Sequence, residues 1–208
     1  YSFDPAFSNW LNLYWGNFHQ TTKYTYQIHF NDSINFRDEY TSKVKSPINR
    51  AKKNQLKIVN INLEDFCAIL NKSYKAKNTK APYKKKNLIR FLNSLINHDC
   101  FYFKGVADSE GNIHAVAGLV YDNKSSNLIL NGSDPVYREY SGNTLIIDHM
   151  IEFASTRSKI FDFEGSMHQR IEHFYFGFGG VLTPYYHIWK NNIFTRFFGG
   201  INYQIEHH

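Results

Sequence analysis

The stretch from Phe161 to Tyr186 constrains the fold more than any other part of the chain. It opens with Phe-Asp-Phe-Glu, an alternation that places two aromatic rings on one face of a strand and the carboxylates of Asp162 and Glu164 on the other. Gly165 and Ser166 end this strand, and a short helix with two phenylalanines at four-residue spacing follows. A glycine pair then stops the helix before a further strand. This succession of strand, paired carboxylates, turn, helix and strand is typical of a binding or catalytic site.

Hydrophobic periodicity upstream of this stretch predicts a mixed α/β chain. The predicted elements are, in chain order, strand 24–30, a basic helix 36–54 interrupted near Pro47, strand 56–61, a helix capped by Asn62, a helix with Leu88, Phe91, Leu92 and Leu95 inward, strands 100–107, 113–121 and 127–131, and a long helix with Ile146, Met150, Phe153 and Ala154 inward. A strand at Ile160, the short helix and strand 181–188 complete the order. The turns between the three middle strands are short and rich in Asp, Asn, Gly and Ser, so we expect antiparallel pairing.

Three segments resemble the GNAT acyltransferase superfamily, in the branch related to the Fem-type transferases that build peptidoglycan cross-bridges. They are the 161–186 stretch, residues 15–26, and Asn131-Gly-Ser-Asp-Pro135 with the later Ser141-Gly142. The resemblance covers most of residues 10–188. It implies an α/β (α+β) fold of GNAT type, with a mixed, mostly antiparallel central sheet that is splayed in the middle and flanked by helices. Periodicity predicts the same order of elements.

The resemblance also suggests a division of the chain. We expect a GNAT-like acyltransferase domain at 36–190, an N-terminal segment at 1–35 and a C-terminal tail at 191–208. Members of the branch usually carry a preceding GNAT-like half, and the N-terminal segment is interpreted as its remnant. Either the chain is a fragment of a longer protein, or the first half is missing from this numbering.

The implied reaction is direct transfer of an acyl or aminoacyl group to an amine, which requires a proton to leave the amine. Glu164 is predicted to be the base or a carboxylate that orients the substrate, because it ends a strand in aromatic surroundings that raise a carboxyl pKa. The alternative is an ion pair of Glu164 with Arg170 that holds the turn. Tyr185, or else Tyr186, is predicted to protonate the leaving group, with core packing as the alternative.

Three further residues of the same segment are predicted to bind substrate: Asp162, Ser166 and His168. A structural role for Asp162 and a helix-capping role for His168 are the alternatives. A metal site is not expected, since His168 and His173 are five residues apart and point away from each other on a helix. No nucleophile motif for a covalent intermediate occurs either, which favours direct transfer.

The start of the long helix is the implied donor-binding site, because helix N-termini bind phosphate groups. Its predicted donor-binding residues are Ser141, Gly142, Asn143 and Thr144. The family pattern has Arg or Gln three residues before the glycine and a small residue two after it, whereas this chain has Glu139 and Thr144 there. A carboxylate repels a pyrophosphate and a branched side chain crowds it. Acyl-CoA and aminoacyl-tRNA therefore both stay open as donors, beside an ordinary helix start capped by Ser141.

Positive charge is concentrated in one part of the chain. The net formal charge is +6, and the Lys43–Arg90 region has fourteen Lys or Arg against Glu64 and Asp65 only. Such a surface attracts tRNA or an acidic membrane surface, and the alternative is a solvated helical face. No apolar run reaches the length of a membrane span, and two cysteines provide no disulfide framework. We therefore expect a cytoplasmic protein, or one bound peripherally at the inner membrane face.

Three classes of function remain. The first is a GNAT-fold acyl- or aminoacyltransferase that forms an amide on a small-molecule or peptidoglycan-precursor amine. The second is a non-catalytic GNAT-fold protein that binds an anionic partner through the Lys43–Arg90 region, which the altered donor segment favours. A nucleic-acid-binding module ranks last, because no RNA-recognition motif occurs.

Overall fold

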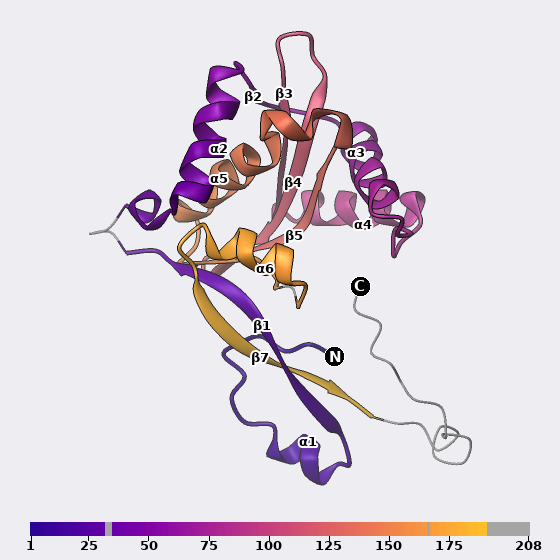
Figure 1. Ribbon diagram of the computed structural model, residues 1–208. Helices are drawn as coiled ribbons and strands as arrows, with labels where there is room; N and C mark the ends of the chain where they lie inside the picture. The colour runs from indigo at the N-terminus through magenta and orange to yellow at the C-terminus, as the bar shows by residue number, and fades with distance from the viewer. Residues whose placement is uncertain (32–34, 166, 191–208) are drawn as a thin grey trace.

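The computed structural model describes residues 1–31, 35–165 and 167–190, which form a central sheet with helices on both faces (Figure 1). Its strands are β1 (His19–His29), β2 (Lys57–Val59), β3 (Phe101–Ala107), β4 (Ile113–Tyr121), β5 (Ser125–Ser133), β6 (Ile160–Asp162) and β7 (Val181–Trp189). Its helices are α1 (Leu11–Trp15), η1 (Phe36–Glu39), α2 (Ser42–Lys53), α3 (Leu63–Ala76), α4 (Lys85–Asn97), η2 (Pro135–Tyr140), α5 (Gly142–Ser155) and α6 (Gln169–Phe176). The strand order is β2-β3-β4-β5-β6-β1-β7, and the described neighbours are antiparallel except β5 with β6. The predicted mixed, mostly antiparallel sheet flanked by helices is confirmed.

Two hydrophobic cores lie on opposite faces of the sheet. Along β4, Ala115 and Ala117 face the core beneath α2 and α5, whereas Val116 between them faces the core beneath α3 and α4. This alternation is the period of a strand that is covered on both sides. It follows that α2 and α3, which are adjacent helices in the chain, lie on opposite sides of the sheet (Figure 1).

Two details of the helices differ from the prediction. Pro47 lies inside α2 and does not interrupt it; the break falls instead between η1 and α2, at Tyr40 and Thr41. The helix tolerates the lost hydrogen bond because its buried stripe packs beside α5. Phe91 of α4 was expected to face inward, but 52% of its surface is exposed, since α4 covers its core with Leu88 and Leu92, beside the half-buried Ile89 and Leu95.

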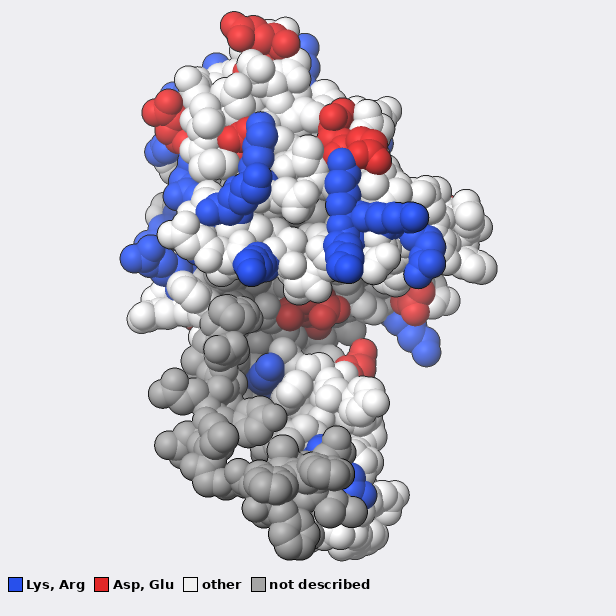
Figure 2. Space-filling model, turned by 90° about the vertical axis from the view of Figure 1, so that its right-hand side faces the viewer, with Lys and Arg blue, Asp and Glu red and all other residues white. Residues whose placement is uncertain are grey.

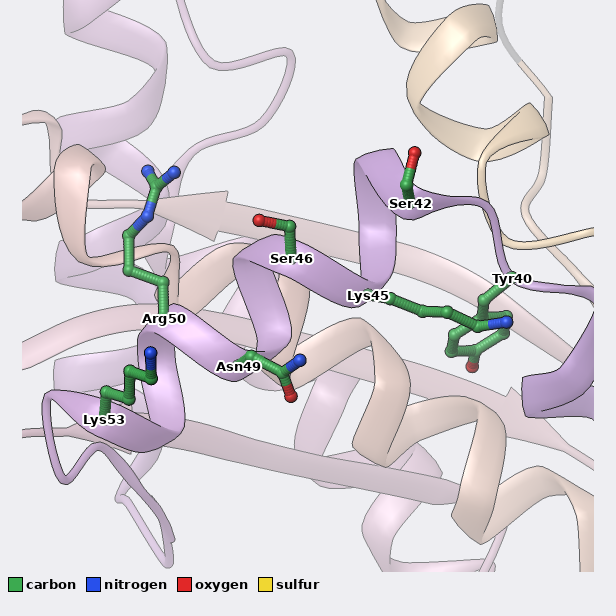
Figure 3. A pocket seen from close by; sticks show the side chains of 7 residues that line it. All are labelled: Tyr40, Ser42, Lys45, Ser46, Asn49, Arg50 and Lys53. Atoms are coloured by element: carbon green, nitrogen blue, oxygen red, sulfur yellow. The ribbon is translucent and has the colours of Figure 1, made fainter.

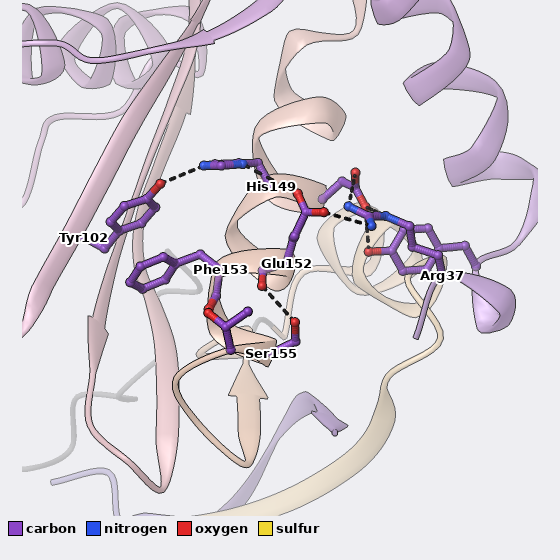
Figure 4. A network of polar contacts seen from close by, with 9 residues as sticks. Arg37, Tyr102, His149, Glu152, Phe153 and Ser155 are labelled. Carbon is purple, nitrogen blue, oxygen red and sulfur yellow. Dashed lines mark hydrogen bonds and ion pairs between the residues drawn. The ribbon is translucent and has the colours of Figure 1, made fainter. Parts of the chain in front are cut away.

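A polar network ties η1 to α5 (Figure 4). Arg37 donates from Nε and Nη2 to the two carboxylate oxygens of Asp148, at 2.9 and 3.1 Å, and from Nη1 to Glu152 at 3.1 Å. Tyr40 donates to the same Asp148 carboxylate at 3.1 Å. Asp148 is only 5% exposed, so its charge depends on these donors. The network therefore holds the segment before α2 against α5.

One part of the molecule extends away from this body. We call it the arm; it consists of residues 1–26 and 181–190, with α1 and the paired ends of β1 and β7 (Figure 1). Strand β1 belongs to the segment expected to precede the GNAT-like domain, and it pairs with both β6 and β7. The division of the chain at residues 35 and 190 stays a prediction. Among the described helices, none is both long and apolar enough to cross a bilayer.

Candidate active site at the split of the sheet

The sheet opens between β5 and β6. Within the described residues, β6 pairs with β5 only over Ser125–Asn127, while β5 continues to Ser133 along β4. On the other side, β1 pairs with β6 only over Gln27–His29, and its earlier residues pair with β7 alone. After Asn127, which pairs with Asp162 of β6, strand β5 therefore separates from the β1–β7 ribbon (Figure 1). The chain that leaves β6 lies at the point of separation.

Glu164 lies at this point, although not on a strand as predicted. The strand ends at Asp162, and Glu164 and Gly165 both have left-handed backbones, with φ of +60° and +72°. A non-glycine residue rarely adopts this conformation. The predicted alternation therefore holds for the buried rings of Phe161 and Phe163, whereas a left-handed turn sets the direction of Glu164.

The Asp162 carboxylate holds this turn in place. It accepts hydrogen bonds from Thr25 Oγ1 at 2.6 Å, from Gln27 Nε2 at 2.7 Å and from the backbone N–H of Glu164 at 2.7 Å. The side chains of Asp162, Thr25 and Gln27 are all buried. Three donors thus fix the carboxylate, and through it the position of Glu164. The predicted contact of Asp162 with substrate stays a prediction.

Gly165 is required by close contact, which makes a testable prediction. A Cβ atom there would lie 2.5 Å from the carbonyl oxygen of Tyr24 in β1. Gly165→Ala is therefore expected to destabilise the protein by about 1–3 kcal/mol through backbone strain, with a further cost from this clash. Gly111→Ala is the matched control, because Gly111 also has a positive φ but no atom within 4 Å of its Cβ position. Equal losses of unfolding free energy in urea would show that the contact is unimportant.

Electrostatics couple Glu164 to its neighbours. The residue stays exposed, so its carboxyl is only partly desolvated. That desolvation raises the pKa of Glu164 above its ordinary value, and the negative charges of Asp162 and Asp4 raise the pKa further. A raised pKa makes the ionised carboxylate a better proton acceptor than an ordinary glutamate, and contact with solvent keeps it accessible.

Tyr185 belongs to the same group of side chains. It pairs with Lys23 across β1 and β7, and it therefore shares a sheet face with Thr25 and Asp162. Burial raises the pKa of the Tyr185 phenol, and the charges of Glu164 and Asp162 raise that pKa further. The phenol stays protonated at neutral pH. The two residues predicted as base and proton donor are thus brought together.

Some residues of this site were missed by sequence reasoning. Thr25 and Gln27 could have been found from the polar positions that alternate with Tyr24 and Tyr26 along β1. Ser166 lies outside the described residues. His168 occupies the N-cap position of α6, where its backbone carbonyl accepts from Ile171 and Glu172.

The predicted donor-binding residues begin α5. Ser141 is left-handed, with φ of +64°, and a Cβ on Gly142 would lie 2.9 Å from the Cβ of His114. Thr144 is buried, and its N–H donates to the carbonyl of Ser141 at 3.1 Å. The Asn143 Oδ1 atom is buried without a partner among the described residues. The amide of Thr144 is therefore engaged, and those of Gly142 and Asn143 are the donors that a phosphate would meet.

The basic region from Lys43 to Arg90 is not one face, because the sheet passes between its helices. The cations of α2 lie on the side of α5, beside an open hollow lined by Tyr40, Ser42, Lys45, Ser46, Asn49, Arg50 and Lys53 (Figure 3). Those of α3 and α4 lie on the opposite side, where Figure 2 shows Lys and Arg side chains across the body. Two of them are paired: Lys72 with Asp134 at 2.6 Å, and Lys85 with Glu64. The expected single surface is thus two smaller ones.

Solved structures share this architecture, whereas no family model and no curated protein matches the sequence. FemX superposes with a TM-score of 0.71 at 12% identity, over 86% of this chain and 68% of FemX. The chain has a Fem-like GNAT fold. The C-terminal domain of a putative lysylphosphatidylglycerol synthetase from Agrobacterium fabrum gives 0.60 at 11% identity, over 90% of this chain and 69% of that chain. L-PGS from Bacillus licheniformis superposes with a TM-score of 0.59 at 10% identity, over 91% of this chain and 68% of that chain.

The Fem-like fold was expected from the 161–186 stretch, and the expectation is confirmed. In this fold the described sheet splits beside Glu164, the residue of the 161–186 stretch that is predicted to be catalytic. At such low identities the likeness concerns the arrangement of the chain. Which reaction the site performs depends on its own residues and not on the fold.

Proposed function

We propose that the protein is an acyl- or aminoacyltransferase that forms an amide on an amine acceptor by direct transfer. The observation that carries this proposal is the Glu164–Tyr185 group at the split of the sheet, held by the buried Asp162. Glu164 removes a proton from the attacking amine, and Tyr185 donates one to the leaving group. Both pKa shifts suit those roles, because a raised pKa strengthens the Glu164 carboxylate as a base and the Tyr185 phenol keeps its proton at neutral pH. The acceptor is a small-molecule or peptidoglycan-precursor amine.

The shape of the split favours an extended donor. From Asn127, where β5 and β6 part, to Ser133 the strand rises about 20 Å, and η2 then leads to the start of α5. A donor with its phosphates at α5 and its reactive carbonyl beside Glu164 would follow this path. Acyl-CoA and aminoacyl-tRNA both have such a length. One of the similar structures is a domain of a putative lysylphosphatidylglycerol synthetase, a name that supports aminoacyl transfer.

A thermal-shift screen tests for donor binding. A ligand that binds the native state alone must raise the melting temperature, by an amount set by its concentration relative to its Kd. The screen compares acyl-CoAs, aminoacyl-tRNA and matched uncharged tRNA. We expect a rise with one acylated donor that exceeds the rise with its deacylated form. A rise that is equal for the acylated and deacylated forms would favour the non-catalytic, anion-binding alternative.

The pH dependence of the reaction follows from Glu164. As a base it acts only when ionised, so kcat/KM should increase as pH rises through its raised pKa. The acidic limb of the profile is therefore expected above the ordinary range of a glutamate. Asp4→Asn removes one negative neighbour and should move this limb to lower pH, with little change at the plateau. An unmoved limb would assign the titration to another group.

The choice of donor can be tested at η2. Glu139 is exposed and precedes the α5 amides, where its charge opposes a pyrophosphate. If the donor is acyl-CoA, Glu139→Gln should tighten CoA binding by about 0.3–1 kcal/mol. Calorimetry on both proteins measures this difference. If neither protein binds CoA, acyl-CoA is excluded and aminoacyl-tRNA becomes the proposed donor.

A further inference from the structure

The arm contains every tryptophan of the chain. Trp10 and Trp15 lie at the two ends of α1, and Trp189 ends β7, where it stacks on His19 with ring centroids 5.7 Å apart. Trp15 is 68% exposed and Trp189 37% exposed. Tryptophan is normally among the most buried side chains. A concentration of exposed tryptophan in one projecting part requires an explanation.

Helix α1 presents a continuous apolar face. Leu11, Tyr14 and Trp15 are spaced three and four residues apart, so they lie on one side of the helix. They are 50%, 59% and 68% exposed, and none of the five residues of α1 is buried. Exposed apolar patches of this kind mark surfaces that bind a partner or a membrane.

The charges of the arm favour a lipid surface. Its described residues contain one carboxylate, Asp4, which accepts from the backbone N–H of Ala6 at 2.7 Å. The cations are Lys23 and Lys190, and the ammonium of Lys190 lies 5.0 Å from the ring centroid of Phe18. Tyrosine and tryptophan beside lysine are the residues enriched where proteins meet the interface of a bilayer. Anionic headgroups complement the cations.

The position of the apolar face suits a flat surface. Figure 1 shows α1 at the end of the arm that lies furthest from the body, so it can reach a bilayer without the helices of the body touching it. We propose that α1 inserts its apolar face into the interface of a bilayer that contains anionic lipids. Leu11 and Trp15 enter the boundary of the acyl chains, Tyr14 stays at headgroup depth, and the lysines contact phosphate groups. This surface differs from the Lys43–Arg90 region and does not depend on the proposed transfer reaction.

Tryptophan fluorescence tests this directly, because the whole signal comes from the arm. The full chain is mixed with vesicles of phosphatidylcholine and phosphatidylglycerol, with and without brominated acyl chains. We expect a blue shift of the emission, with quenching by the brominated lipid. The double variant Leu11→Ser/Tyr14→Ser, which keeps all three reporters, should lower the partition coefficient by at least about tenfold. Vesicles of phosphatidylcholine alone should bind more weakly, since the cations then lack partners.

Phe91→Ser on α4 is the matched control. Phe91 is 52% exposed, much like Leu11, but it lies on the body, so its loss should leave partitioning unchanged. Absence of a blue shift and of quenching at low salt with anionic vesicles would overturn the proposal. A lipid-free oligomer in light scattering that dissociates in Leu11→Ser/Tyr14→Ser would overturn it too, because α1 would then be a protein-binding surface.

Discussion

Replacing Glu164 by Gln is expected to lower the rate constant for amide formation at least about tenfold, because the amide keeps the shape of the side chain but accepts no proton. The loss should appear in kcat and in kcat/KM alike, since proton removal occurs in the transition state. The acidic limb of the pH profile should disappear with it. Steady-state kinetics above and below neutral pH measure both effects.

Two comparisons separate this effect from a change in folding. The Asp162 contact uses the backbone N–H of Glu164, so the variant should keep its turn and its melting temperature. Glu110→Gln, in the β3–β4 turn near the Ser133 end of β5, removes a carboxylate remote from Glu164 and should leave the rate unchanged. A folded Glu164→Gln protein with the turnover of the unchanged chain would remove Glu164 from the mechanism.

Replacing Arg37 by Ala is expected to reduce the free energy of unfolding by about 3 kcal/mol, the low end of the cost of breaking a buried ion pair, because Arg37 is itself partly exposed. Asp148 would stay buried with Tyr40 as its remaining side-chain donor among the described residues. The hydrogen bond from Arg37 to Asp148 also raises the pKa of Arg37 further above its ordinary value, so the guanidinium stays charged at all relevant pH values. Urea denaturation gives the difference.

A double variant shows whether the buried charge causes this loss. Arg37→Ala/Asp148→Asn removes both charges and should recover part of the stability, since a neutral amide is cheaper to bury than an unpaired carboxylate. Arg157→Ala is the control, because Arg157 is an exposed arginine just after α5. Its guanidinium carbon lies 5.7 Å from the ring centroid of Phe153. A loss at Arg37 no larger than the loss at Arg157 would contradict the account.

Local signals were enough to predict most of the fold. The Asn62 cap is confirmed, since its side chain accepts from the N–H of Asp65 at 2.8 Å. The antiparallel pairing of β3, β4 and β5 is confirmed as well. It was predictable because residues that are close in the sequence form the turns and the alternation of these strands. Such features depend on contacts within a few positions of the chain.

Features that depend on distant residues were not predictable. The left-handed turn of Glu164 needs Thr25 and Gln27, which lie more than a hundred positions earlier and reach Asp162 only through the β1–β6 pairing. The basic region similarly looks like one surface along the chain, until the sheet places α2 and α3 on opposite sides. In both cases the pairing of the strands decides which residues come together, and hydrophobic periodicity along the chain does not specify that pairing.

The most direct test of the central claim is transfer of a labelled acyl or aminoacyl group to an amine. The protein is incubated with labelled acyl-CoAs or aminoacyl-tRNAs and a set of amines, and the amide product is identified by mass spectrometry. The proposal predicts an amide that accumulates with the unchanged chain and is at least about tenfold slower with Glu164→Gln. If none of these donors yields an amide while the protein binds them in the native state, the fold serves binding alone and the proposed reaction is wrong.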